Sequence, residues 1–311
     1  MARVDVQHMS ANLELRFDRH PSTVAFMLRA FRPKPGLRKA GRFPPIRAGW
    51  RQHRVDARHL GQFLRLTGLP ADQGLPLLYP HVLSFPLQMV ILTHPAHPLA
   101  IWNSLQVRNQ LLRHRPIPAD ALLDMQTSVV GQRVLEKGAE LDLHTGIRTG
   151  DELVWESVNT FYYRGRFGEP DAPSSLTAAP AVGDQTLAQW HMAAGVGWRF
   201  GGLTGDYNGI HWSNWYARRL GFRRAFHHPQ LVLGQCMARL PRLASAGAQR
   251  LDTWLKGPVY YDSEVSLRAT LTVDSRSFAL IAAGEEQPAI LGRWRETKAS
   301  ENLLDQEKIP E

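Results

Sequence analysis

Gly-Asp-Tyr-Asn-Gly-Ile-His occupies residues 205–211 and is the densest group of polar, hydrogen-bonding residues in this chain of 311 residues. The stretch before it, Gln189 to Phe200, predicts a half-buried strand because apolar side chains recur at every second position. After it, Trp215 to Leu220 is expected to form a short helix that Ser213 or Asn214 can cap. The motif should therefore lie in a loop between a strand and a helix, a common place for catalytic groups.

An aspartate and a histidine at this spacing can form a general acid/base pair. Histidine titrates near neutral pH, and a neighbouring carboxylate can orient its ring. The side-chain amide of Asn208 could hold Asp206 in one rotamer. The alternative is an Asx-type turn followed by a structural histidine. The residues alone leave both interpretations open.

The chain repeats one order of elements, a helix followed by antiparallel strands. In the first half, Pro86 to Thr93 predicts a helix, and Leu141 to Tyr163 predicts two strands joined by a turn. In the second half, Pro229 to Leu240 predicts a helix, and Val265 to Ala283 predicts two strands. Each proline stands at the expected first helical position, where its missing N–H costs little. Two such units indicate an internal duplication.

The motif and the residues after it resemble the signature of the MaoC-like, or hydratase 2, family. That pattern is Gly-Asp-x-Asn-Pro-(Ile/Leu)-His, then an Ala, a Gly-Phe and a His-Gly that opens the central helix. Here it is matched by Thr204 to His211, Ala217, Gly221-Phe222 and Phe226 to Pro229. The resemblance implies an α+β double hotdog fold, in which each module has a long central helix wrapped by an antiparallel β-sheet. The motif is absent from the first half, as in two-module members of the family.

The resemblance also implies a function and its residues. The protein would be a hydro-lyase of fatty-acyl metabolism, which hydrates 2-enoyl thioesters or dehydrates (R)-3-hydroxyacyl thioesters of CoA or acyl carrier protein. Asp206 and His211 would be the catalytic pair, holding one water molecule and moving its protons, with Asn208 and Gly205 in support. The acyl thioester is the expected substrate, and neither a cofactor nor a metal is expected.

Two departures from the family pattern bear on this function. Gly209 replaces the proline of the motif and is expected to loosen the loop. Pro229 replaces the glycine whose amide should stabilise the enolate oxygen of the thioester, and proline has no N–H to donate. The backbone amides of Gln230 and Leu231 could substitute. The alternative is a non-catalytic or weakly active acyl-thioester-binding protein of the same fold.

Changes in composition and the breaks rich in proline and glycine predict that the chain has five parts. They are a basic, proline-rich extension (1–52), an N-terminal hotdog-like module (53–168), a linker (169–184), a catalytic C-terminal hotdog module (185–297) and a charged tail (298–311). Between Arg29 and Arg51 there are eight basic residues and no acidic residue, and four prolines oppose regular structure there. This extension is either an anion-binding or membrane-surface arm, or a loop wrapped around the body.

The net charge of +9 points to an anionic partner. Coenzyme A and an acidic carrier protein both fit, whereas nucleic acid is not expected, because the chain has no RNP motif, zinc finger or basic helix with heptads. Arg223, Arg224 and Lys256 are candidates for binding the thioester or its phosphates. The alternative is that they form a solvated basic face.

A cytoplasmic location is expected. The chain has one cysteine and no apolar run close to the roughly 18 residues that a transmembrane helix needs. It also lacks the apolar core of a secretory signal at its start. Because a duplicated chain can replace a dimer of single modules, a monomer or a homodimer of double-hotdog chains is expected.

Overall fold

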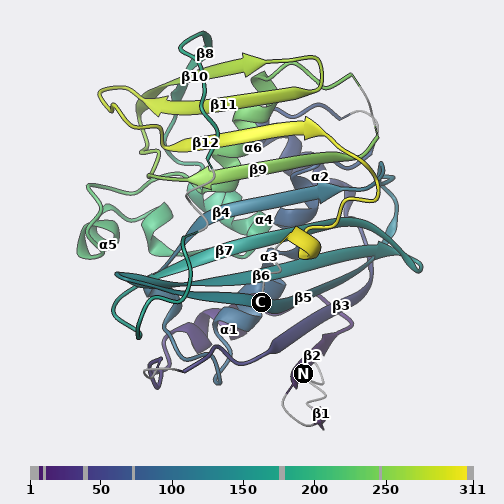
Figure 1. Ribbon diagram of the computed structural model, residues 1–311, viewed down its shortest axis with the longest axis vertical. Coiled ribbons are helices and arrows are strands. Elements are labelled where there is room, and N and C mark those ends of the chain that lie inside the picture. Colours follow the sequence, from purple (N-terminus) through teal and green to yellow (C-terminus); the bar gives the residue numbers. More distant parts are fainter. Residues whose placement is uncertain are drawn as a thin grey trace.

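The computed structural model describes residues 7–9, 12–37, 41–71, 74–174, 179–244 and 247–306 (Figure 1). The strands of this part of the chain are β1 (Gln7–Met9), β2 (Asn12–Phe17), β3 (Ile46–Arg54), β4 (Ser104–Arg113), β5 (Leu122–Leu135), β6 (Gly138–Thr149), β7 (Glu152–Arg164), β8 (Thr186–Met192), β9 (Gln249–Leu255), β10 (Ser263–Leu271), β11 (Ser275–Ala282) and β12 (Ile290–Glu296). The helices are α1 (Thr23–Ala30), α2 (Ala57–Thr67), α3 (Tyr79–Leu92), α4 (Gly197–Thr204), α5 (Asn214–Arg219) and α6 (Pro229–Arg239), with 3-10 turns η1 (Ile101–Asn103), η3 (Gly209–His211) and η4 (Leu304–Gln306).

The strands form one sheet in the order β1-β2-β3-β5-β6-β7-β4-β9-β12-β11-β10-β8. Neighbours are antiparallel except β2 and β3. The order is mirrored about the seam where β4 pairs with β9 and Leu111 lies opposite Leu251. On each side of the seam, a helix (α3 or α6) precedes a seam strand and then a meander of three strands. The predicted duplication is present, and the double hotdog fold class is confirmed.

The central helices α3 and α6 lie against one face of the sheet (Figure 1). Helix α6 begins at Pro229, as predicted. Helix α3 begins at Tyr79, so the prediction that Pro86 opens it is wrong: Pro86 lies inside the helix. All residues of α3 are buried. Packing on every side therefore stabilises this helix despite the hydrogen bond that an interior proline removes.

The strand predicted before the motif is shorter than expected. Strand β8 ends at Met192, and the residues from Gly197 onward form α4 instead. Gly195 adopts φ of 83°, which interrupts the extended chain. Trp198 is exposed whereas Phe200 is fully buried, as expected for positions two apart on a helix and not on one face of a strand.

The N-terminal extension contains regular structure, against expectation. The four prolines lie between α1 and β3 rather than inside them, and β3 pairs with β5 as an interior strand of the sheet. The segment between α1 and β3 lies along the body, where Nζ of Lys34 donates to the carbonyls of Thr93 and His94 at 3.2 and 2.7 Å. Two of the basic residues counted in the extension, Arg38 and Lys39, fall outside the described residues.

The described residues of the predicted linker, 169–174 and 179–184, contain no helix or strand. Within the described ranges, no helix has both the length and the apolar character needed to cross a membrane.

Candidate active site

A cavity of about 490 Å³ lies between the two halves and is lined by Asp206, Asn208, Ile210 and His211 of the predicted motif. Its walls come from α1, α3, β4 and β7 of the first half, and from the loop after α4, the start of α6 and the loop after β9 of the second. Apolar side chains dominate the wall from the first half, namely Met27, Phe85, Met89, Ile101, Trp102, Leu105 and Phe161. An apolar cavity with a few converging polar groups is typical of a small-molecule site.

The motif begins where α4 ends. Gly205 has φ of 74° and donates its N–H to the carbonyl of Gly201, which ends the helix in a left-handed residue. A Cβ on Gly205 would lie 3.0 Å from the ring of Phe26 on α1. The hydroxyl of Thr204 then accepts the N–H of Asp206 at 3.1 Å. Gly205 therefore supports the site by turning the chain from α4 into the cavity.

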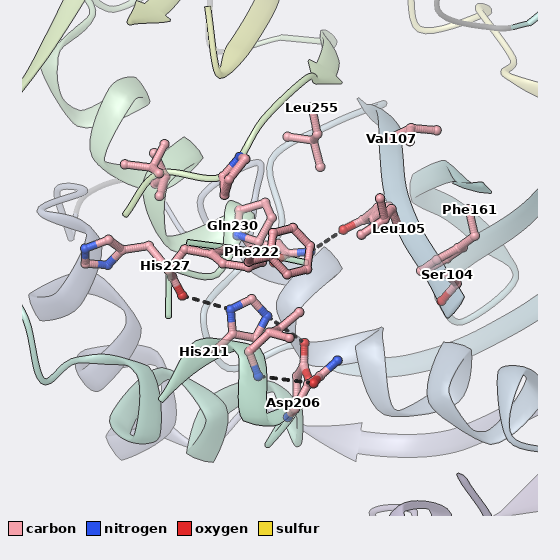
Figure 2. A pocket seen from close by; sticks show the side chains of 18 of the residues that line it. Ser104, Leu105, Val107, Phe161, Asp206, His211, Phe222, His227, Gln230 and Leu255 are labelled. Carbon is pink, nitrogen blue, oxygen red and sulfur yellow. Dashed lines mark hydrogen bonds and ion pairs between the residues drawn. The ribbon is translucent and has the colours of Figure 1, made fainter. Parts of the chain in front are cut away.

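Asp206 and His211 meet in the cavity wall (Figure 2). Nε2 of His211 lies 3.7 Å from Oδ2 of Asp206, which is too far for a direct hydrogen bond. One water molecule or substrate hydroxyl could contact both atoms. Nδ1–H of His211 donates to the carbonyl of Phe226 at 3.0 Å. The neutral ring therefore keeps its lone pair on Nε2, the nitrogen that faces the carboxylate.

The environment of His211 favours the neutral ring. Burial lowers the pKa of His211, while the charge of Asp206 and the carbonyl of Phe226 raise it by less, so that the net shift is downward. At neutral pH the imidazole is consequently unprotonated at Nε2. It can accept a proton there without first losing one.

Asn208 orients Asp206, but not in the predicted way. The backbone N–H of Asn208 donates to Oδ1 of Asp206 at 3.1 Å. The side-chain oxygen of Asn208 instead accepts the N–H of Ile210 at 3.3 Å and caps η3. The prediction that the Asn208 side chain holds Asp206 is wrong, because two successive Asx-type turns use each side chain for the backbone two residues on.

Gly209 lies in a closely packed part of the loop. A Cβ at this position would lie 2.7 Å from the ring of Tyr216, so the space that a proline ring would need is already filled. The carbonyl of Gly209 accepts the N–H of Trp212 at 3.2 Å and of Ser213 at 2.8 Å. The departure from the family pattern is thus matched by the aromatic side chain on α5.

Two residues that sequence reasoning missed hold the backbone of His211. The hydroxyl of Tyr261 donates to the carbonyl of His211 at 2.6 Å. Gly197, at the start of α4, lies against the same carbonyl, and a Cβ there would come within 2.0 Å of it. Gly197 is therefore required for close approach rather than for an unusual φ. Gly197 lies eight residues before the motif, in the stretch expected to be a strand, and Tyr261 lies 50 residues after His211.

His228, at the start of α6, contacts both members of the pair. Its ring stacks on that of His211, and its Nε2–H donates to the backbone carbonyl of Asp206 at 3.0 Å. Within the described ranges, Asp206, His211 and His228 have ligand atoms within 4.8 Å of one another, a spacing that a metal ion would accept. The hydrogen bond and the stacking already account for the placement of His228. That no metal binds here stays a prediction.

The two candidate oxyanion amides differ. The N–H of Leu231 donates to the carbonyl of His228 at 3.1 Å, so it is engaged within the first turn of α6. In the described part of the chain, the N–H of Gln230 makes no hydrogen bond. Both Pro229 and Gln230 line the cavity. Gln230 is thus the better placed of the two candidates.

The side chain of Gln230 also reaches the cavity wall. Its Nε2 donates to Oε1 of Gln106 on β4 at 2.6 Å, a bond that Figure 2 shows. Nε2 of Gln106 in turn donates to Oδ1 of Asn159 at 3.3 Å. This chain of amides joins the start of α6 to the first half of the molecule. The sequence contained no local signal for it, because its members lie on three separate elements.

The predicted phosphate-binding residues separate into two groups. Lys256 is exposed and lines the cavity. Arg223 and Arg224 do not line it: both guanidinium groups lie over the ring of Tyr260, at 4.8 and 5.8 Å from its centroid, and Arg223 also pairs with Glu285. Of the three predicted residues, only Lys256 lines the cavity.

The chain is similar to MaoC-like dehydratases, and the resemblance predicted from the motif is confirmed. The chain is 28% identical over 198 residues to 3-hydroxyacyl-thioester dehydratase X of Mycobacterium tuberculosis (strain ATCC 25618 / H37Rv), covering 60% of this chain and 68% of that protein. No family model matches the chain.

Solved structures share the fold. The crystal structure of HtdX of Mycobacterium tuberculosis superposes with a TM-score of 0.68 and 21% identity, over 81% of this chain and all of that one (100%). A MaoC-like dehydratase from Phytophthora capsici superposes with a TM-score of 0.67 and 16% identity, over 81% of this chain and 95% of that one. At these identities the likeness concerns the fold.

Proposed function

We propose that the protein is an (R)-specific 2-enoyl-thioester hydratase, or 3-hydroxyacyl-thioester dehydratase, of fatty-acyl metabolism. One observation carries the proposal: Nε2 of His211, the ring nitrogen that is not hydrogen-bonded to Phe226, faces the carboxylate of Asp206 in the wall of an apolar cavity. The name of the similar protein from Mycobacterium tuberculosis, a 3-hydroxyacyl-thioester dehydratase, supports it.

In the hydration direction, one water molecule lies between Asp206 and His211. The pair takes a proton from this water as its oxygen bonds to C3, and the C2–C3 π electrons move to the thioester oxygen as an enolate. The enolate then collapses and C2 takes the proton that the pair holds. The water is fully consumed, its hydroxyl at C3 and its hydrogen at C2. Dehydration is the reverse.

The remaining groups fit this reaction. The free N–H of Gln230 at the start of α6 would stabilise the enolate oxygen, aided by the helix dipole. The apolar wall from the first half would hold the acyl chain, and Lys256 would meet the phosphates of coenzyme A or of a carrier-bound phosphopantetheine. The thioester is the substrate and the reaction requires no cofactor. A cytoplasmic location and a monomeric or homodimeric state stay predictions.

The test is turnover of crotonyl and decenoyl thioesters, on coenzyme A and on carrier protein, followed by loss of enoyl absorbance. Asp206→Asn and His211→Ala should each lower kcat by roughly a hundredfold to ten-thousandfold, the range for a general acid or base. Asp184→Asn, which changes a carboxylate outside the cavity, should leave kcat unchanged. Wild-type turnover that both active-site variants retain would refute the proposal.

Pro229 favours a second candidate, a weakly active acyl-thioester-binding protein of the same fold. The residue lines the cavity at the start of α6 and offers no amide. Pro229→Gly adds an N–H at this position. If the missing donor limits the rate, kcat should rise by about tenfold or more in this variant. Binding of an enoyl thioester without turnover in either form would support the second candidate.

A further inference from the structure

The border of the cavity carries large apolar side chains that face solvent. Met27 of α1 lines the cavity, and so does Ile210 of η3, which lies between α4 and α5. Helix α1 and the segment from α4 to α5 (197–219) therefore border the cavity. Six side chains on these two elements, here called the apolar rim, are each between 51% and 68% exposed: Val24, Leu28, Phe31, Trp198, Trp212 and Trp215. Exposed apolar groups gathered in this way mark interaction surfaces, whereas scattered ones need no explanation.

The spacing on α1 shows that this exposure is organised. Val24, Leu28 and Phe31 recur at intervals of four and three, so they share one face of the helix, while the opposite face packs the fully buried Phe26 into the core. On the second element, the rings of Trp198 and Trp212 meet edge to face, with centroids 5.5 Å apart. The rim therefore consists of one amphipathic helix and one aromatic cluster.

The two segments of sequence that carry the apolar rim are rich in basic residues and poor in acidic ones. Residues 19–55, which contain α1, include ten Lys or Arg residues and no Asp or Glu. Residues 185–251, which contain α4 and α5, include eight Arg residues and a single acid, Asp206, which lies in the cavity. Among the basic groups, Arg219 lies over the ring of Trp215 at 5.2 Å from its centroid. Arginine and tryptophan are thus interleaved at the surface.

Exposed apolar side chains together with basic residues favour one kind of partner. A second copy of the chain would bring the same positive surface against itself, which repulsion disfavours. An acidic protein would match the charge but would not explain six exposed apolar side chains. The interface of an anionic bilayer matches both, because tryptophan rings settle at the headgroup level, aliphatic side chains enter the acyl boundary, and arginines meet the lipid phosphates.

We propose that the apolar rim docks the protein on the surface of a membrane rich in anionic phospholipid, with the mouth of the cavity towards the lipid. The docking does not depend on the proposed chemistry. If the protein acts on acyl thioesters, which is the proposed function, docking would place the cavity where long-chain thioesters partition.

The test is co-sedimentation of the full chain with vesicles of phosphatidylcholine alone and of phosphatidylcholine mixed with phosphatidylglycerol. Binding should require phosphatidylglycerol and weaken as salt is raised. The double variant Leu28→Ser, Trp215→Ser should bind the mixed vesicles at least about tenfold more weakly, since it removes one anchor from each element of the rim. Val273→Ser, which changes an apolar side chain that is 87% exposed on the turn between β10 and β11, should bind as the wild type does.

Turnover separates this proposal from the proposed function. Neither Leu28 nor Trp215 lines the cavity, so the double variant should hydrate a short, water-soluble crotonyl thioester at the wild-type rate. Absence of binding to mixed vesicles, or equal binding by the double variant, would overturn the docking proposal whatever the enzyme does. So would a double variant that loses turnover only with carrier-bound substrate in the absence of vesicles, because the rim would then be a carrier-protein site.

Discussion

The imidazole rings of His211 and His228 stack face to face, with centroids 3.8 Å apart and planes 23° from parallel. His228 also donates from Nε2 to the backbone carbonyl of Asp206. Burial and the nearby His211 hold the pKa of His228 well below its ordinary value, so its ring is neutral. One neutral side chain therefore braces both members of the pair without adding charge to the site.

His228 should accordingly act as a positioning residue. His228→Phe keeps a flat ring against His211 but loses the hydrogen bond to Asp206, and it should lower kcat roughly tenfold with little change in KM. His228→Ala loses the stacking as well and should cost more. Steady-state kinetics on a crotonyl thioester measures both. Equal kcat in the phenylalanine variant and the wild type would show that the hydrogen bond is not needed.

Gly197 and Gly202 both lie on α4, so their alanine variants form a matched pair. Gly197→Ala places a Cβ 2.0 Å from the carbonyl of His211, so the loop must shift. We expect a loss of about 1–3 kcal/mol in the free energy of unfolding, and a fall in kcat of roughly a hundredfold, because a displacement near 1 Å can cost that much. Gly202→Ala meets only an ordinary contact at 3.5 Å with the hydroxyl of Tyr207, and should raise stability by up to about 1 kcal/mol.

Chemical denaturation and initial rates measure both glycine variants. The contrast between them is the informative quantity, since both changes add the same methyl group to α4. Equal kcat in the two variants would mean that the approach of Gly197 to His211 does not position the catalytic pair.

The pH dependence of the rate follows from His211. Its Nε2 accepts a proton only in the neutral form, so kcat/KM should fall as the pH drops through the pKa of His211. Burial lowers that pKa below its usual 6.5. The acidic limb of the profile for a crotonyl thioester should therefore lie below pH 6.5. A limb above that value would mean that the charge of Asp206 outweighs burial, or that another group controls the rate.

Local signals in the sequence were sufficient for part of the site. Asp206 and His211 lie together as the motif predicts, Ser213 caps α5, and α6 begins at Pro229, because turns, caps and helix starts depend on residues a few positions apart. The resemblance of the motif to a family added the double hotdog fold. The chain itself gave the duplicated order of helix and strands.

What the sequence did not predict depends on contacts between distant segments. Gly197 was assigned to a strand because its neighbours alternate in polarity. Only the structure shows that the carbonyl of His211 leaves no room for a side chain at this position. Tyr261, in the loop between β9 and β10, and Gln106, on β4, reach the site from segments far from the motif in sequence. The interior proline of α3, Pro86, is tolerated because the whole helix is buried. Packing of this kind overrides local propensity.

The stability of the fold should fall in mild acid. Burial lowers the pKa of His81 on α3 to about 4, from 6.5. Between these two values the unfolded chain binds more protons than the folded one, so the free energy of unfolding is complete above pH 6.5 and declines as the pH drops towards 4. Denaturant titrations across this range should show His81→Gln with a slope shallower by about 1.4 kcal/mol per pH unit, the equivalent of one proton. Ser84→Ala, one turn further along the same buried helix, changes no titrating group and should lower stability without changing the slope. Identical slopes for the wild type and His81→Gln would show that His81 is protonated in the folded protein or released by local opening.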